Sequence, residues 1–177
     1  MKNILMKKIK EYALPVLIPI ALVLIINTFI LDYGVVPSPS MAPVADEGTF
    51  IVGSRLSYLN DDPDRGDVVI FTKDGRMMVK RVIGISGDYL FFKDGQVYRN
   101  GELLEEPYLL EQGSTFSPIY EFYIPEGEYF LMGDNRKVSD DSRRWDVPTI
   151  LRDDISSKAL YVIPFKESRT EKAGKII

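Results

Sequence analysis

The run from Ala13 to Leu31 holds no charged residue over about 19 positions, close to the roughly 20 that a helix needs to cross a bilayer. A buried core helix is the alternative interpretation, but the run has no polar face. A cleaved signal peptide would have a shorter apolar region and a small-x-small cleavage site, which "NTFILDYG" does not supply. Pro15 and Pro19 are expected in the first turns, where a missing backbone donor is best tolerated. The sequence therefore predicts one transmembrane helix.

Charge is distributed unequally around this run. Lys2, Lys7, Lys8 and Lys10 precede it, whereas the first basic residue after it is Arg55. Because cytoplasmic flanks carry the excess of Lys and Arg, we expect the N-terminus in the cytoplasm and the remainder on the outer face of the membrane. The segment before the run carries +3 and the whole chain −4, which leaves −7 for the remainder. An acidic domain of this kind is a poor binder of nucleic acid.

The remainder of the chain has β patterns almost throughout. "TFIVGSRL", "DVVIFT", "YEFYI", "EYFLMGD" and "KALYVIPF" are rich in β-branched and aromatic residues. Asp74-Gly75, Asp94-Gly95 and Asn100-Gly101 each stand between two such runs, which predicts hairpins. "PTILRDD" is the only expected short helix. The predicted fold class is all-β, a mostly antiparallel, coiled or barrel-like sheet domain with one N-terminal transmembrane helix.

We expect four parts along the chain. Residues 1–12 form the cytoplasmic N-terminus, 13–31 the transmembrane anchor, 32–165 the extracytoplasmic β-rich domain and 166–177 a polar, loosely held tail.

Cysteine and histidine are both absent from the chain. Their absence excludes a thiol nucleophile, a Ser-His-Asp triad and metal sites built on those two residues. The acidic stretch "NDDPDRGD" lacks the spacing of a calcium-binding hand and is interpreted as a loop, so no cofactor is expected. Hydrolytic chemistry in this chain must rest on carboxylates, lysines or hydroxyls.

A serine activated by a lysine is the simplest hydrolase that remains. The lysine must be neutral to act as a base, and lowering its pKa from about 10.4 to about 8 requires roughly 3 kcal/mol, mostly from burial. Lys80 in "RMMVKRVIGI" is a candidate, because strand alternation places it on one face with Met78 and Val82. Arg81 lies on an equally apolar face, so a solvated Lys-Arg pair at a strand edge is the simpler interpretation of this segment alone.

Ser38 and Ser40 lie between prolines in "VVPSPSMAP". A serine beside proline is most often a turn residue or a helix cap. Ser40, however, is nine residues from Leu31, a reach of at most about 30 Å, so it must stay near the membrane surface. A third segment, "GDNRKVSDDSRRWDVP", is either a charged surface loop or a set of polar groups that orient a buried lysine.

Four segments, "PSPSMAP", "RGDVVIF", "VKRVIGISGD" and "GDNRKVSDDSR", together resemble the ordered sequence boxes of bacterial type I signal peptidases. The single span and the short chain resemble the Gram-positive form of that family. The resemblance implies a Ser-Lys endopeptidase with a β-fold. Such an enzyme removes signal peptides from exported preproteins, after small residues in an A-x-A-like pattern, at the outer face of the cytoplasmic membrane. The implied partners are preproteins, membrane lipid and a nearby secretion translocon.

The resemblance also implies roles for individual residues. Ser40 would be the nucleophile and Lys80 the general base. Ser38 would form the oxyanion hole together with the Ser40 backbone N–H, and Ser139 would orient the lysine amine.

Further residues are implied to lie near the site. Asp141 and Arg143 would form a structural ion pair, and Val36 and Val79 would line the small substrate pockets. The chain departs from the family pattern at two positions. Val138 stands where asparagine is usual, and Ser157 stands where glycine is usual.

Other functions remain open at this stage. Self-cleaving repressor peptidases share the Ser-Lys pair but are soluble and bind DNA, and the absence of histidine argues against the Ser-His signal peptidases of the endoplasmic reticulum. A specialised processing peptidase for pilins or conjugation proteins, and a catalytically silent assembly chaperone of the same fold for surface fibres, are the remaining alternatives. Retention of both Ser40 and Lys80 argues against the chaperone.

Overall fold

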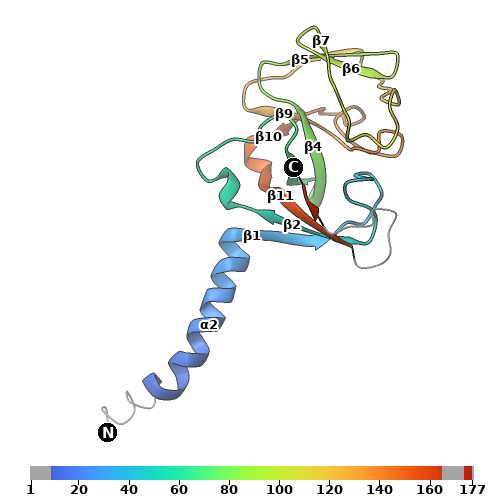
Figure 1. The fold of residues 1–177 in the computed structure, drawn as a ribbon. Coiled ribbons are helices and arrows are strands. Elements are labelled where there is room, and N and C mark those ends of the chain that lie inside the picture. Colours follow the sequence, from blue (N-terminus) through green and yellow to red (C-terminus); the bar gives the residue numbers. More distant parts are fainter. Residues whose placement is uncertain (1–8, 165–173, 177) are drawn as a thin grey trace.

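The computed structural model describes residues 9–164 and 174–176. Figure 1 shows a long helix that leaves one end of a β domain. The helical residues form three consecutive segments, η1 (Ile9–Ala13), α2 (Leu14–Ile25) and η2 (Ile26–Ile30), of which the first and last have π geometry.

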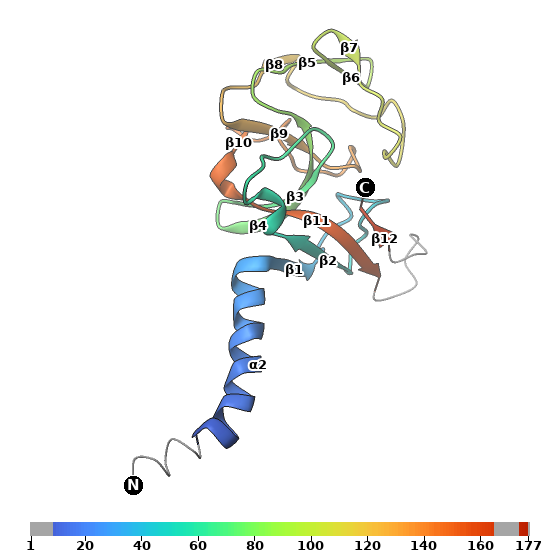
Figure 2. The ribbon, with the colours of Figure 1, turned by 60° about the vertical axis from the view of Figure 1, so that its left-hand side comes forward.

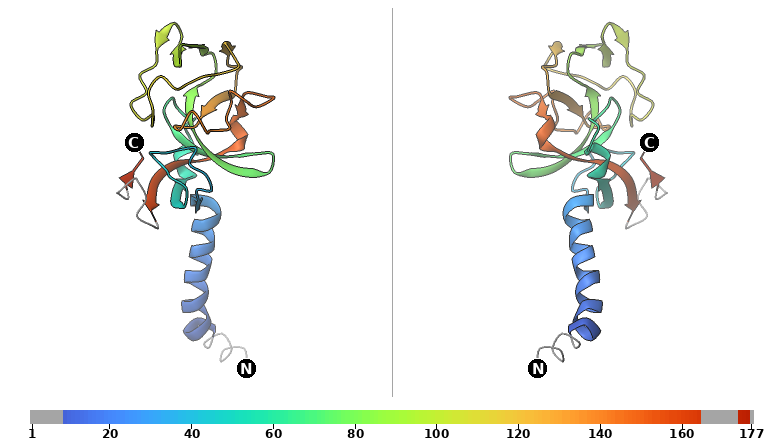
Figure 3. Two further views of the ribbon diagram at one scale, coloured as in Figure 1. Left: turned by 90° about the vertical axis from the view of Figure 1, so that its right-hand side faces the viewer. Right: turned by 90° about the vertical axis from the view of Figure 1, so that its left-hand side faces the viewer.

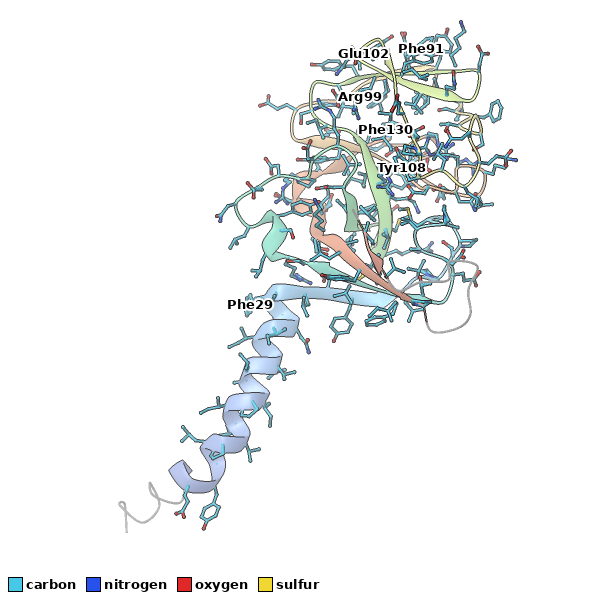
Figure 4. All side chains as sticks on the ribbon, viewed as in Figure 1. Phe29, Phe91, Arg99, Glu102, Tyr108 and Phe130 are labelled. Atoms are coloured by element: carbon cyan, nitrogen blue, oxygen red, sulfur yellow. The ribbon has the colours of Figure 1, made fainter. Side chains whose placement is uncertain are left out.

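The helix has the length and composition of a membrane span. Glu11–Ile30 has a mean hydropathy of 2.5 and none of α2 is buried. Figure 4 labels Phe29 near the end of the helix that meets the domain, and the residue is 66% exposed. Two details differ from the sequence prediction. The helix begins at Ile9, so Pro19 lies inside it rather than in its first turn, and Leu31 already belongs to the first strand. Lys2, Lys7 and Lys8 lie outside the described residues.

An antiparallel sheet of eight strands is attached to this helix. Its order is β1-β2-β11-β3-β4-β9-β10, with β12 also paired to β11. The strands are β1 (Leu31–Val35), β2 (Thr49–Ser54), β3 (Val68–Lys73), β4 (Arg76–Gly84), β9 (Glu128–Met132), β10 (Ile150–Leu151), β11 (Ile155–Pro164) and β12 (Gly174–Lys175).

A second antiparallel sheet has four strands in the order β7-β6-β5-β8. These are β5 (Tyr89–Lys93), β6 (Gln96–Arg99), β7 (Glu102–Leu103) and β8 (Glu121–Tyr123). Figures 2 and 3 show that this small sheet lies at the end of the domain away from the helix. The all-β, mostly antiparallel fold class predicted from the sequence is confirmed.

The three predicted hairpins are present at β3–β4, β5–β6 and β6–β7. Asp74, Asp94 and Asn100 have φ angles of 50°, 51° and 55°, and the glycine that follows each is also left-handed. Two successive residues with positive φ are what a type I′ turn requires, and its twist matches that of the flanking strands.

The core surrounds β3. Val68 and Ile70 are buried on one face of this strand, and Val69 and Phe71 are buried on the other. A third cluster of buried residues joins the two sheets. Figure 4 labels one of its members, Phe130 of β9, where the two sheets meet. Because both faces of β3 are covered, the strands on either side of it are held in fixed positions.

Two local predictions need correction, and one strand was not expected. The segment after the span is a strand, β1, because it pairs with β2 along its whole length. "PTILRDD" is a short strand followed by one 3-10 turn, η4 (Arg152–Asp154), and a further 3-10 turn, η3 (Leu56–Tyr58), was not expected. The tail was expected to be loosely held, yet β12 pairs with β11 and Ile176 is buried in the core. Residues 165–173 and 177 of that tail lie outside the described part.

"NDDPDRGD" forms the predicted loop. Its last aspartate, Asp67, accepts hydrogen bonds from Tyr58 Oη and Lys158 Nζ. The described residues contain no group of three or more Asp and Glu side chains placed to hold a metal ion.

Candidate active site

Ser40 lies in the connection between β1 and β2, residues 36–48. Met41, directly after it, is fully buried and forms an isolated bridge with Ala45, which is also fully buried. A second contact, from Ala42 N to Pro39 O at 3.1 Å, closes the turn around the serine. These contacts and the fixed φ angle of proline hold Ser40 in one place, with 8% of its surface exposed.

Lys80 meets Ser40 across 40 residues of sequence. Its Nζ donates a hydrogen bond to Ser40 Oγ at 2.9 Å, and the lysine is only 3% exposed. Ser38 Oγ donates to the same Ser40 oxygen at 3.3 Å, from the exposed side. The structure therefore brings together three of the residues singled out in the sequence.

Both Lys80 and Arg81 are buried, each 3% exposed. The simpler interpretation of the sequence, a solvated pair at a strand edge, is wrong. β4 is covered at this position because β3 pairs with it on one side and β9 begins to pair at Arg81 on the other.

Burial lowers the pKa of Lys80 from its ordinary value, because a charged amine loses water there. Asp141, Asp140 and Asp134 act in the opposite direction, and the positive charge of Arg143 assists burial. The net shift is downward, which is the direction that a lysine base requires.

The segment from Gly133 to Arg143, called here the catalytic loop, is mostly buried although it is rich in charge, with Lys137, Val138 and Asp140 exposed. Arg81 donates to both carboxylate oxygens of Asp134 at 2.8 and 2.6 Å, and Arg143 donates to both oxygens of Asp141 at 2.8 Å. All four of these side chains are almost completely buried. The alternative of a charged surface loop is therefore wrong for this part of the segment, since each of the two buried carboxylates is neutralised by a guanidinium.

The Asp141–Arg143 pair also affects the lysine. Burial alone would raise the pKa of Asp141, but the Arg143 guanidinium outweighs burial and holds that pKa below its ordinary value. Because Arg143 balances the nearest carboxylate, the attraction that would stabilise a charged Lys80 is weakened.

Asn135 and Gly133 fix the catalytic loop against the serine. Asn135 N donates to Ser40 O at 3.0 Å, and its Nδ2 donates to Pro39 O at 3.2 Å. Gly133 packs so closely that a Cβ there would lie 2.4 Å from Ser40 O. Only glycine fits at position 133 without moving the loop.

Ser139 is fully buried next to Gly133, but it makes no hydrogen bond with Lys80 in the part of the chain that the structure describes. Its Oγ has no partner with regular geometry. The hydroxyl approaches Asp141 and contributes to the lowered pKa of that carboxylate. The predicted orienting role of Ser139 stays a prediction, and here its hydroxyl lies nearer to Asp141.

A pocket of about 190 Å³ opens beside the Ser40–Lys80 pair. Val36 and Val79, the two valines implied to line substrate pockets, both border it, together with Met77 and Met78. Its lining is mostly apolar, with Ser38, Ser40 and Lys80 at one side.

The two departures from the family pattern differ in their surroundings. Val138 is 55% exposed, so valine in place of the usual asparagine does not change the packing of the core. Ser157 is fully buried with an unpartnered Oγ, which would lie 2.7 Å from a Cβ at Gly53. A serine is accommodated at position 157 because the facing strand carries a glycine.

The sequence prediction missed Gly133, Asp134 and Asn135 as individual contributors. A signal was available, because "GDN" follows directly on the apolar strand "EYFLM", where a turn must leave the core. Their partners, Arg81 and Ser40, are more than 50 residues distant in sequence, so the pairing itself could not be read from the sequence.

Comparison with known proteins gives consistent matches. The model of a family described as signal peptidase, peptidase S26, matches residues 9–163. Signal peptidase I S of Bacillus subtilis (strain 168) is 33% identical over 177 residues, which cover 92% of this chain and 94% of that protein. Signal peptidase I U of the same organism is 33% identical over 184 residues, covering 97% and 98%. A crystal structure of a signal peptidase I from Enterococcus faecalis V583 shares 30% identity, with a TM-score of 0.47, and the match covers 55% of this chain and 97% of that one.

Proposed function

The chain belongs to the signal peptidase family, peptidase S26, and on that premise we propose that it cleaves signal peptides from exported preproteins through a dyad of Ser40 and Lys80. Membership makes it a signal peptidase hydrolase, so a catalytically silent chaperone is no longer a candidate. The observation that carries the proposed dyad is the 2.9 Å contact between Lys80 Nζ and Ser40 Oγ in a buried site.

In the proposed first step, neutral Lys80 accepts the proton of Ser40 Oγ as that oxygen attacks the carbonyl carbon of the scissile bond. The resulting ammonium then gives this proton to the leaving amine, and the C–N bond breaks. The signal peptide remains as an ester on Ser40. In the second step Lys80 takes a proton from water and the hydroxide attacks the ester carbon. The bond from that carbon to Ser40 Oγ then breaks, Lys80 returns the proton to Ser40 Oγ, and the signal peptide leaves with a free carboxyl group.

Negative charge develops on the carbonyl oxygen during both steps. The Ser40 backbone N–H donates to no acceptor among the described residues, and the Ser38 hydroxyl lies 3.3 Å from Ser40 Oγ. We assign these two donors to the oxyanion hole, where removal of one typically costs about 3 kcal/mol of transition-state stabilisation.

The pocket beside the dyad supports a preference for small side chains. At about 190 Å³, bordered by Val36 and Val79, it has room for alanine-like groups on an extended peptide. Among the described residues, the backbone edges around it have no second strand. β1 is paired there with β2 only, and residues Arg76–Lys80 of β4 lie before the segment paired with β9. An extended substrate can therefore add to an open strand edge next to Ser40.

The N-terminal helix supports a membrane anchor with the catalytic domain on the outer face. Its last turn ends at Ile30 and β1 starts at once, so Ser40 lies within about 30 Å of the span. Anchoring the enzyme and a membrane-bound preprotein in one bilayer raises their effective concentration. The four-part division of the chain and the cytoplasmic position of residues 1–12 belong to the same proposal, as does proximity to the secretion translocon.

The test is cleavage of a purified preprotein with an A-x-A site by wild type, Ser40→Ala and Lys80→Ala, followed by sequencing of the new N-terminus. Both variants should lose activity, whereas Lys93→Ala, which removes an exposed lysine, should cleave normally. Activity that survives either dyad substitution contradicts the mechanism. Cleavage confined to one class of substrate, such as pilins, would favour the specialised processing peptidase.

A further inference from the structure

The segment between β7 and β8 reaches back from the small sheet to the catalytic loop. Glu106, in this segment, is 6% exposed and accepts two hydrogen bonds from Arg136, at 2.9 Å from Nη1 and 2.5 Å from Nη2. Thr115 Oγ1 accepts a third bond from Arg136, at 2.6 Å. A planar guanidinium held in this bidentate way has a defined orientation as well as a neutralised charge.

Arg136 belongs to the catalytic loop and is 1% exposed. Its Nε donates to Gly133 O at 3.0 Å, and its own carbonyl accepts a bond from Arg143 Nη2 at 2.9 Å. The side chain of Arg136 thus binds the first residue of the loop, and its backbone carbonyl binds the side chain of the last. Asn135, the neighbour of Arg136, donates to Ser40 O.

Tyr108 connects the same segment to β4. Its hydroxyl donates to Glu106 Oε1 at 2.8 Å, and its ring lies 4.0 Å from the guanidinium carbon of Arg81. Arg81 adjoins Lys80 in the strand and pairs with Asp134 of the catalytic loop. Figure 4 shows Tyr108 in the upper half of the molecule, beside the ribbon of β4.

Two routes of direct contacts and chain neighbours thus lead from Glu106 to the dyad, and the ion pairs of Arg136 and Arg81 within them are buried. One route runs through Arg136 and Asn135 to the Ser40 carbonyl, and the other runs through Tyr108 and Arg81 to the strand that carries Lys80. Glu106 touches neither Ser40, Lys80 nor the pocket beside them. Such a residue can affect the geometry of the dyad without contributing to substrate binding.

We propose that Glu106 is a positioning residue, which holds Arg136 so that the catalytic loop keeps Ser40 and Lys80 in reacting geometry. The proposal rests on the Ser40–Lys80 mechanism above and adds a residue from the segment that joins β7 and β8 of the small sheet, outside all four sequence boxes. On this view the small sheet is a support for the active site.

The test compares Glu106→Gln with Glu105→Gln, the same substitution at an adjacent, exposed position. Cleavage of a fluorogenic peptide with an A-x-A site gives kcat and KM separately, and thermal unfolding gives the folded fraction. Glu106→Gln should lower kcat per folded enzyme by ~10- to 100-fold, the effect of a small misplacement of reacting groups, with KM close to wild type. Glu105→Gln should match wild type in both constants.

A double variant separates positioning from the mere cost of an unpaired buried cation. Glu106→Gln leaves Arg136 without its carboxylate, and adding Arg136→Met removes that charge and should restore part of the stability. If Glu106 positions the loop, kcat stays low in the double variant although its unfolding temperature recovers. Recovery of kcat together with the unfolding temperature would overturn the proposal, as would a loss confined to KM.

A milder substitution keeps the test decisive if Glu106→Gln does not fold. Thr115→Ala removes one hydrogen bond to Arg136 and leaves the ion pair intact. It should lower kcat at unchanged KM, and wild-type kcat in this variant would overturn the inference. An active wild type, an inactive Ser40→Ala and a fully active Glu106→Gln would reject this inference while leaving the proposed function in place.

Discussion

Gly133→Ala should show how the position of Ser40 affects kcat, separately from its effect on the stability of the fold. A Cβ at position 133 would lie 2.4 Å from Ser40 O and 2.3 Å from Ser139 Oγ, whereas ordinary contacts begin at 3.4 Å. The catalytic loop must therefore move away from Ser40 by about 1 Å. The 3.0 Å hydrogen bond from Asn135 N to Ser40 O would be stretched or lost in that movement.

Two free energies follow from this displacement. Overpacking of this kind destabilises the folded state by about 1–3 kcal/mol, which lowers the unfolding temperature by several degrees. A displacement of about 1 Å at the reacting groups costs about 100-fold in rate, or about 2.7 kcal/mol of activation free energy. We expect Gly133→Ala to fold at assay temperature and to lose about 100-fold in kcat.

Gly84→Ala is the matched control. Gly84 belongs to β4, the strand that carries Lys80. Its added Cβ would lie 2.4 Å from Ile124 Cδ1, a contact as short as the one at position 133, in the hydrophobic cluster that joins the two sheets. Both variants should lose stability, and only Gly133→Ala should lose kcat, as measured by peptide cleavage and thermal unfolding on the same preparations. Equal kcat values in the two variants would refute the idea that Gly133 sets the position of Ser40.

Four further predictions concern the dyad, the oxyanion hole and the anchor. Because burial lowers the pKa of Lys80, kcat/KM should rise with pH along one titration that ends below the ordinary lysine value of 10.5, and a flat profile from acid to neutral pH would point to another base. Arg143→Met removes a charge that lowers this pKa, so the titration should shift to higher pH while stability falls by about 3–5 kcal/mol; an unshifted profile counts against the electrostatic account. Ser38→Ala should reduce kcat by about 10²–10³-fold, Ser38→Thr should retain most of it, and equal rates for the two would remove Ser38 from the oxyanion hole. Enzyme lacking residues 1–30 should cleave soluble peptides but lose much of its rate on preproteins in vesicles, and equal rates with and without these residues would argue against the anchor.

The parts of this fold that are determined by residues adjacent in the sequence could be predicted from it. Asp74-Gly75 and the two similar pairs specify their own turns, and the apolar run specifies a helix from composition alone. β1 was missed because a short strand beside a proline segment has no local signature, and its pairing with β2 is what makes it a strand.

Burial of charge could not be predicted in the same way. Lys80 and the catalytic loop look solvated in sequence. Asp134 and Arg136 are buried there because Arg81 and Glu106 neutralise them, and only the fold supplies these partners. Arg136 is the clearest example, because Glu106 stands 30 positions away in a segment with no other mark of importance. The resemblance to signal peptidases located the dyad, whereas the support around it required the three-dimensional arrangement.

The direct passage from η2 at Ile30 to β1 at Leu31 has a consequence for substrate choice. No flexible linker separates the helix from the sheet. An ion pair between Asp32 of β1 and Arg55, the residue after β2, joins the start of β1 to the end of β2. In the proposed membrane-anchored arrangement, this direct connection would limit the movement of the domain and keep Ser40 near one height above the hydrocarbon. The anchor would then select cleavage sites by their distance from the end of the membrane-embedded segment as well as by their side chains.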